Sequence, residues 1–227
     1  MECGCQAERQ KHLDLPRGSV DVDVYARDAT REPVLTIVCE CKQWSTAVPK
    51  QVVHAFRTVV DEVGANIGFI ISAHGFQRGA IQAAENTCVH LVTWEEFQAR
   101  FFDRWFAAMR VKLAARADEV FEYSDYFHRR TTSVLHGIPA RVEELSSLHH
   151  RFSAYITVTS YSRILQLEPM TFPAQMVDPR ATEITTIEVK DARTYFDLLL
   201  SAADQAIAAY EAFIAKYEAL DAAGHDD

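Results

Sequence analysis

The sequence predicts an α/β domain over residues 1–105, followed by a mainly α-helical region. Residues 18–25 (GSVDVDVY) alternate strictly between apolar and polar side chains, which is the period of a half-buried strand. Residues 66–72 (NIGFIIS) form a continuous apolar run, typical of a strand covered on both faces. Between these two segments, apolar residues from Val52 to Val63 recur at three- and four-residue spacing, which indicates an amphipathic helix. Strands that alternate with helices favour the α/β class.

The second strand and the first helix follow from turn and stop signals. Residues 34–42 (VLTIVCECK) come after a polar turn at 27–33, so this strand can pair with the first strand as a hairpin. We expect the helix to begin near Pro49 and to end at Gly64, because glycine adopts the left-handed conformation that closes a helix.

Two more elements complete the predicted domain. A short Ala-rich helix is expected at 79–86 and a strand at 88–93. Thr93 and Glu96 have the spacing of a capping box, in which the two residues satisfy the free N–H groups at a helix start. A further helix should therefore begin there.

The region 106–227 is predicted to form a helical domain. Helices are expected at 101–123, 138–165 and 192–221, because apolar residues recur along one face of each. The first helix crosses the expected boundary, and a weak β-like segment lies at 184–189, after three prolines. The prolines are Pro169, Pro173 and Pro179. The predicted inner faces of the three helices, in chain order, are Phe102, Phe106, Met109, Leu113 and Ala117; Val142, Leu145, Phe152 and Ile156; and Phe196, Leu199, Ala203, Ile207, Tyr210, Ile214 and Tyr217.

Composition excludes several classes of protein. Hydrophobic residues make up 48% and charged residues 24% of the 227 residues, which is ordinary for a globular protein and excludes disordered and collagen-like chains. No apolar run approaches the roughly 18 residues of a membrane span. The polar N-terminus lacks the apolar stretch of a signal peptide. We therefore expect a cytoplasmic protein without a membrane partner.

The cysteines indicate a cellular compartment and do not indicate a metal site. Five cysteines without a secretion signal are typical of a reducing cytosol. Cys39 and Cys41 alternate with charged residues, so we expect them to be buried strand residues rather than metal ligands.

One polar constellation on the two predicted hairpin strands could carry chemistry. Alternation places Asp23 on the polar face of the first strand, and Glu40 and Lys42 together on one face of the second. Paired carboxylates are suitable ligands for Mg²⁺, and a neighbouring lysine can stabilise charge on an attacked phosphate. The triplet occurs again as Glu188-Val189-Lys190, but there no alternating strand with a facing aspartate precedes it.

The context of this constellation resembles the Mrr-like branch of the PD-(D/E)xK restriction endonuclease superfamily. The resemblance covers about residues 15–100 and includes the strand ending at Asp23, the Glu40-Cys41-Lys42 triplet, the helix beginning QVVHAF, the strand GANIGFIIS, the GFQRGA turn and the closing TWEEF. It implies a restriction-endonuclease-like mixed central sheet flanked by helices. It also implies that Asp23, Glu40 and the backbone carbonyl of Cys41 bind Mg²⁺ or Mn²⁺, and that Lys42 completes the catalytic set.

The sequence departs from the family pattern at both ends. The helix that usually precedes the first strand would be short here, and Glu2 or Glu8 would have to supply its acidic residue. The region after 105 lacks the tight helix-turn-helix spacing of a winged-helix domain, so readout of a DNA sequence is not predicted.

Further polar residues are candidates for contacts with nucleic acid. Lys50, Gln51, His54 and Arg78 lie near the starts of the two predicted helices, where they could contact phosphate, although solvent exposure alone would also account for them. Asp21 shares the polar face of Asp23.

Two clusters of histidine and arginine residues in the second region are expected to have structural rather than functional explanations. We expect His128-Arg129-Arg130 to complement a helix C-terminus. His149 and His150 are expected to be exposed, because neighbouring residues on a helix point about 100° apart and chelate one ion poorly.

These observations favour a Mg²⁺-dependent DNA endonuclease of restriction, phage defence or DNA processing. A homodimer is expected because cutting both strands requires two sites, and the stripe at 196–217 offers a seam. The helical region could alternatively sense a protein partner. Two other functions remain open: a catalytically silent module that binds DNA or protein, and a structure-specific nuclease similar to Holliday-junction resolvases.

The net charge of −9 does not exclude DNA as a partner. Residues 1–105 contain 11 Lys+Arg and 14 Asp+Glu, or −3, whereas residues 106–227 contain 12 and 18, or −6. Most of the acidity therefore lies outside the predicted nuclease, and we expect weak, salt-sensitive binding of DNA.

Overall fold

The computed structural model describes residues 3–15, 18–125, 127–164 and 171–223. They form two compact units, Met1–Ala108 and Met109–Asp227, and each is described by itself. Of the residues considered above, Glu2, Pro169 and the last residue of the expected helix 138–165 lie outside the described residues.

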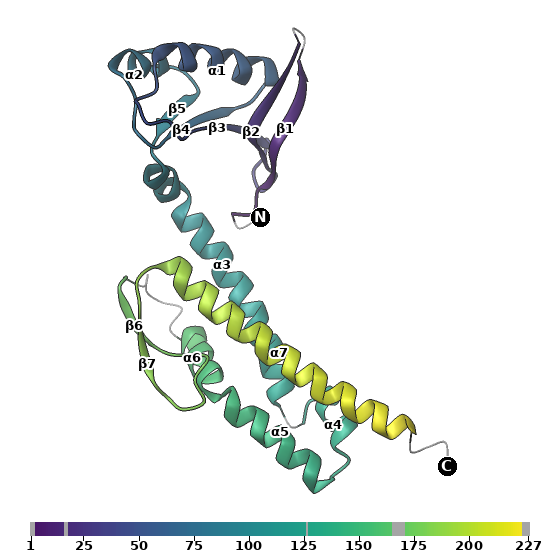
Figure 1. Cartoon of the computed structure of the whole chain (residues 1–227). Coiled ribbons are helices and arrows are strands. Elements are labelled where there is room, and N and C mark those ends of the chain that lie inside the picture. The colour runs from purple at the N-terminus through teal and green to yellow at the C-terminus, as the bar shows by residue number, and fades with distance from the viewer. Residues whose placement is uncertain (1–2, 16–17, 126, 165–170, 224–227) are drawn as a thin grey trace. The chain divides into compact units, whose positions relative to one another are not determined.

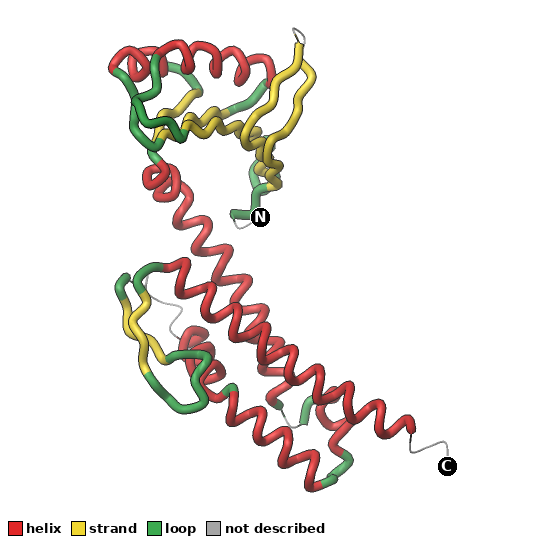
Figure 2. Tube along the Cα trace, viewed as in Figure 1, coloured by secondary structure: helices red, strands yellow, loops and turns green. Residues whose placement is uncertain are grey.

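A mixed five-stranded sheet forms the centre of the N-terminal unit (Figures 1 and 2), which agrees with the predicted fold class. The strand order is β1-β2-β3-β4-β5. Strands β1, β2 and β3 pair antiparallel, while β3, β4 and β5 pair parallel. The bounds are β1 (Gln6–Leu15), β2 (Gly18–Asp28), β3 (Leu35–Lys42), β4 (Ile67–Ser72) and β5 (Val89–Val92).

Helices cover both faces of this sheet. Helices α1 (Lys50–Val63) and α2 (Arg78–Ala84) pack on one face, and the first turns of α3 (Trp94–Ser124) pack on the other. The α1 side of the core contains Val38, Val48, Val53, Phe56, Val60, Ile70, Ala80 and Val89; the α3 side contains Ala26, Ile37, Cys39, Phe69, Ile71 and Val92, with Phe97 and Phe101 packed against them. The buried run of β4 has core on both faces because each of its faces is covered by a helix.

Strand β1 occupies the place where a short helix was expected, so that expectation is wrong. It pairs antiparallel with β2 from Gln6–Arg27 to Leu15–Gly18 and forms the outer edge of the sheet. Edge strands tolerate many charged side chains, and the polar sequence QAERQKH carries no clear apolar period. Pairing with β2 therefore decides the conformation of this segment.

The predicted helix signals act as expected. Gly64 ends α1 in the left-handed conformation, with φ 67°, and its N–H donates to the carbonyls of Asp61 and Val60. At the start of α3, the N–H of Thr93 donates to Glu96 Oε2 at 2.8 Å and the N–H of Glu96 donates to Thr93 Oγ1 at 3.2 Å. This reciprocal pair is the predicted capping box.

The C-terminal unit is mainly helical, as predicted, but its helices have different bounds. Helix α3 is continuous from Trp94 to Ser124, so the two helices expected at its start and at 101–123 are one. The expected helix 138–165 is broken at Phe152. The further elements are α4 (Arg129–Leu135), α5 (Pro139–Arg151), α6 (Ser153–Ile164), β6 (Ala174–Val177), β7 (Thr186–Val189) and α7 (Ala192–Ala223), and β6 pairs antiparallel with β7.

The predicted inner faces are largely buried. Met109, Leu113 and Ala117 of α3 are buried, but Phe102 and Val142 are exposed. Phe102 lies seven residues before Met109 and so on the same side of α3, but in the part of that helix that belongs to the N-terminal unit. Val142 lies about 60° around α5 from the buried Leu145. The stripe of α7 is buried within its own unit, so it does not offer the free dimer seam that the sequence suggested.

Helix α7 is long enough and apolar enough to pass a test for a membrane span. Its most apolar window has a mean hydropathy of 1.3, and 44% of that window is buried inside the folded unit. A core helix of a globular domain has the same properties. Its packed residues, from Ala192 to Tyr217, explain the apolar composition as core.

The two histidine clusters differ from expectation. His128 is the N-cap of α4 and accepts a hydrogen bond from the N–H of Arg130, so the cluster lies at a helix start rather than at a C-terminus. Arg130 instead donates to the hydroxyl of Tyr123 at 2.7 Å. His149 is half-buried beside Tyr210, with ring centroids 5.7 Å apart, rather than fully exposed.

Candidate active site

The sheet opens between β2 and β3 at the place where the predicted site residues lie. The β2–β3 ladder ends at the pair Val24–Cys39. On either side the sheet continues, to Leu15–Gly18 between β1 and β2 and to Lys42–Ser72 between β3 and β4. The beginning of β2 and the end of β3 are therefore not paired with each other, and the Asp23 side chain lies between them.

The carboxylate of Asp23 spans this opening. Its Oδ2 accepts a hydrogen bond from the backbone N–H of Cys41 at 2.7 Å. The N–H and C=O of one strand residue point to the same side, so the carbonyl of Cys41 also faces the β2 side. Asp23 and the Cys41 carbonyl are thus brought to one place.

Glu40 and Lys42 flank Cys41 on the α1 side of the sheet. Alternation along β3 places them on the same face as the core residue Val38. Lys42 Nζ donates to Glu40 Oε1, and the two side chains are only 18% and 23% exposed, respectively. The ion pair fixes the position of the Lys42 ammonium group beside the Glu40 carboxylate.

This donor set suits a hard divalent cation. Mg²⁺ and Mn²⁺ prefer carboxylate, carbonyl and water oxygens, and Mg²⁺ is commonly held by one or two carboxylates together with substrate phosphate. Asp23, Glu40 and the Cys41 carbonyl are three such donors. Within the described residues, no group of three or more His, Cys, Asp and Glu side chains is placed to hold a metal ion, here or elsewhere, so this donor set consists of two carboxylates and a backbone carbonyl.

The two cysteines of β3 have different environments. Cys39 is buried in the α3-side core, and burial raises the pKa of its thiol to about 12. Cys41 is exposed, contrary to expectation, because its side chain points out where the ladder opens. Partial desolvation and the carboxylates of Asp23 and Glu40 raise the pKa of the Cys41 thiol, so neither cysteine is a thiolate nucleophile at neutral pH.

The four candidate nucleic-acid contacts are all exposed near the start of α1 or α2. Lys50 and Gln51 form the first turn of α1, which has Pro49 as its N-cap, no acidic residue and no side-chain cap. Unpaired N–H groups at such a start favour an anion. His54 is one turn further along α1, and Arg78 begins α2.

Packing brings Lys50 close to α2. The aliphatic stem of Lys50 lies beside Gly79, where a Cβ would be 3.6 Å from Lys50 Cδ. Arg78 precedes Gly79 in the chain, so the two cations belong to the same part of the surface.

Asp21 shares the face of Asp23 but has a partner of its own. His12 Nδ1 lies 2.7 Å from Asp21 Oδ1, and this hydrogen bond raises the pKa of His12. His12 lies on β1, opposite Asp21 in the register. This contact depends on the pairing of β1 with β2, for which the polar sequence of β1 carries no local signal.

Ser72 shapes a turn at the end of β4. It is buried, donates from Oγ to the carbonyl of Gly75 at 3.0 Å and accepts from the N–H of His74 at 3.2 Å. Both hydrogen bonds of its hydroxyl are therefore made with backbone groups of the turn next to the site.

A comparison with protein-family models finds a match over most of the N-terminal unit. Residues 4–101 match the Mrr_cat family model, described as a restriction endonuclease. The matched segment includes all five strands and confirms the resemblance inferred from the sequence. No curated protein is significantly similar to the chain.

One solved structure also shows a similarity. It is the crystal structure of a protein of unknown function, AF1548, with 17% sequence identity and a TM-score of 0.35. The similarity covers 41% of this chain and 52% of that one, so the chain spans about half the length of that protein.

Proposed function

Because residues 4–101 of this chain match the family model of the Mrr-like restriction endonucleases, we propose that the protein is a Mg²⁺- or Mn²⁺-dependent DNA endonuclease. The observation that carries the proposal is the arrangement at the open end of β2 and β3. There the Asp23 carboxylate meets Cys41 while Lys42 is paired with Glu40. Carboxylates that can hold a divalent cation, with a lysine beside them, are suited to metal-assisted hydrolysis of a phosphodiester.

Each group has a distinct role in this proposal. Asp23, Glu40 and the Cys41 carbonyl would hold the cation. When bound, the cation would neutralise charge at the attacked phosphate and lower the pKa of a water. Lys42 places a second positive charge beside the same phosphate, in a partly buried position where its field is weakly screened. The side chain also orients the attacking water by hydrogen bonding.

The start of α1 would hold the neighbouring phosphate. Its free N–H groups, with Lys50 and Gln51, present positive charge without an acidic neighbour in the first turn. Arg78 and His54 extend this surface and contact the DNA backbone, which fixes the position of the strand without reading its sequence.

Cleavage of plasmid DNA tests the proposal. Purified protein with Mg²⁺ or Mn²⁺ should nick or linearise plasmid DNA, and a chelator should stop it. Lys42→Ala should lower the rate at least about 100-fold, because charge stabilisation of the transition state is lost. The measured quantity is the fraction of supercoiled plasmid converted with time.

The chain offers a matched control for this variant. Lys190 is the lysine of the second Glu-x-Lys triplet, directly after the end of β7, and it is exposed. Lys190→Ala should cleave like the wild type. Equal cleavage by wild type and Lys42→Ala, with both proteins folded, would sink the assignment of the site.

The biological setting belongs to the same proposal. We infer a cytoplasmic role in restriction, phage defence or DNA processing, with the helical unit used for dimerisation or for sensing a partner protein. Light scattering that shows only monomer with and without DNA would contradict the homodimer. DNA binding without cleavage under several metals would instead favour a catalytically silent module.

A further inference from the structure

An exposed tryptophan lies beside the proposed catalytic lysine. Trp44 is 42% exposed, and Lys42 Nζ lies 5.4 Å from its ring centroid. The chain's other tryptophans have protein neighbours: Trp105 is buried, and Trp94 stacks on Phe97 with centroids 5.9 Å apart. Among the described residues no second aromatic ring stacks on Trp44.

The loop that carries Trp44 is held in place by backbone hydrogen bonds. It runs over 43–47, and the residues at its two ends are tied to the neighbouring loop after β4. The N–H of Ala73 donates to the Lys42 carbonyl at 3.1 Å, and the N–H of Val48 donates to the Gly75 carbonyl at 2.9 Å. Little loop entropy would therefore be lost when the ring binds a ligand.

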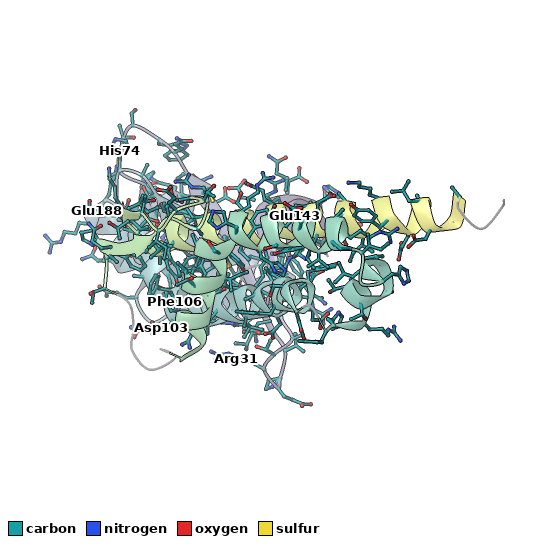
Figure 3. The ribbon with its side chains drawn as sticks, turned by 90° about the horizontal axis from the view of Figure 1, so that it is seen from below. Arg31, His74, Asp103, Phe106, Glu143 and Glu188 are labelled. Atoms are coloured by element: carbon teal, nitrogen blue, oxygen red, sulfur yellow. The ribbon has the colours of Figure 1, made fainter. Side chains whose placement is uncertain are left out.

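The adjoining loop adds a second exposed ring. His74 lies between the two tie points Ala73 and Gly75 and is exposed, and Figure 3 shows it on a loop at the margin of the ribbon. Trp44 and His74 thus belong to neighbouring loops at the same end of β3 and β4.

Charge around these loops favours a polyanion. Residues 41–60 contain three Lys+Arg and no Asp or Glu, and residues 63–84 contain one Arg and no Asp or Glu. The intervening acids, Asp61 and Glu62, lie in the last turn of α1, about 17 Å along the helix from Lys50. Apart from the proposed metal-binding carboxylates Asp23 and Glu40, the two loops and the first turns of α1 and α2 therefore contain no acidic residue.

From these observations we propose that Trp44 stacks on an unpaired nucleobase next to the phosphate that is cut. The proposal rests on the proposed nuclease function and specifies its substrate class: DNA with unpaired nucleotides at the cleavage point. In a continuous duplex the faces of the bases are covered by their neighbours. A ring this close to Lys42 reaches a base face only where the base is unstacked, and every unstacked base offers a π-face regardless of sequence.

Binding measured without cleavage tests this proposal. The probes are an oligothymidylate of about 16 nucleotides and its blunt duplex with oligoadenylate, titrated in chelator into the full chain. Single-stranded probe should quench tryptophan fluorescence, and Trp44→Phe should remove most of that quenching. Trp44→Ala should weaken single-strand binding about 5- to 100-fold, with Trp44→Phe between it and wild type. Duplex binding should change less than about twofold.

Controls separate stacking from other roles of the ring. Trp94→Phe, a substitution of the other exposed tryptophan, should leave both affinities unchanged. If Trp44→Ala weakens the binding of duplex and single-stranded DNA equally, or changes neither affinity, the proposal is overturned. Equal losses would instead indicate a wedge in duplex DNA.

The cleavage assay distinguishes failure of the stacking proposal from failure of the nuclease assignment. Wild-type protein with Mg²⁺ should cut a bubble or flap substrate faster than the matched duplex, and Trp44→Ala should lose that preference. If Lys42→Ala still cuts, the nuclease assignment fails, yet the fluorescence result stands. If Lys42→Ala is inactive but Trp44→Ala keeps its preference for unpaired DNA, only the stacking proposal fails.

Discussion

The carboxylate of Asp23 takes the place of a neighbouring strand at Cys41. The β2–β3 ladder has ended at this point, and the Cys41 N–H donates to the side chain instead of to a backbone carbonyl. Asp23 therefore has a structural contact as well as its proposed place in the metal site.

Two substitutions of Asp23 should separate these roles. Asp23→Asn keeps an oxygen that accepts the Cys41 N–H, so we expect near wild-type stability and loss of metal-dependent cleavage. Asp23→Ala removes the acceptor too, and should cost about 1 kcal/mol more of unfolding free energy. Urea unfolding and plasmid cleavage measure the two effects. Equal stability of both variants would contradict the structural contact.

Single residues also show the limits of prediction from the sequence. Asp23, Glu40 and Lys42 could be placed on one face because strand alternation depends only on the local period. The partner of Asp21 could not be predicted, because His12 lies opposite it on the adjacent strand β1, and no local pattern indicates that β1 pairs with β2.

At the scale of elements, an ion pair joins the end of β2 to α3. Asp28 is buried, and Arg104 donates to both of its carboxylate oxygens, at 2.8 Å from Nη2 to Oδ1. The hydroxyl of Thr30 donates to the same Oδ1 at 2.6 Å. The guanidinium and this hydroxyl hold the pKa of Asp28 well below its usual range.

Loss of this pair should destabilise the N-terminal unit in a pH-dependent way. Asp28→Asn should cost about 2–4 kcal/mol at pH 7, because Arg104 is left without its charge partner. The folded pKa is depressed, so the stabilisation is complete above the unfolded pKa of about 3.9 and is lost as the pH falls toward the folded value. The difference between wild type and variant in urea unfolding should therefore shrink below about pH 4.

An exposed aspartate provides the control. Asp14 lies on β1 with its side chain 98% exposed, and Asp14→Asn should change stability by less than about 0.5 kcal/mol at pH 7. A pH-independent penalty for Asp28→Asn would argue against the ion pair as its source.

Elements with local signals could be predicted, and those without them could not. The bounds of α1 follow from the apolar period and from Gly64, and the start of α3 follows from the capping box. The break between α5 and α6 at Phe152 could not be predicted, because no glycine or proline marks it in the sequence. Strand β1 exists because β2 pairs with it, and its charges suit an edge.

At the scale of the whole molecule, charge distribution governs the expected binding of DNA. The net charge of −9 opposes a polyanion, whereas the surface near α1 and α2 is acid-poor. Binding should therefore be weak and should depend steeply on salt, because each neutralised phosphate releases condensed counterions.

Salt dependence should reveal which cations contact phosphate. Lys50→Gln should reduce the slope of log K against log salt by about 0.7 for single-stranded DNA. Fluorescence anisotropy over a range of salt concentrations measures this slope. Lys190→Gln serves as the control and should leave it unchanged; an equal change in both variants would mean that binding is diffuse rather than localised at α1.

The sequence alone indicated the α/β class, the similarity of residues 4–101 to the Mrr-like restriction endonucleases and the residues proposed for the candidate site, because period, turn residues and motif spacing are local properties. Only the tertiary structure decided that β1 is a strand, that the ladder opens at Asp23 and Cys41, and that Trp44 lies exposed beside Lys42. These features depend on which strands pair and where pairing stops. Such contacts join segments far apart in the chain, and no local pattern records them.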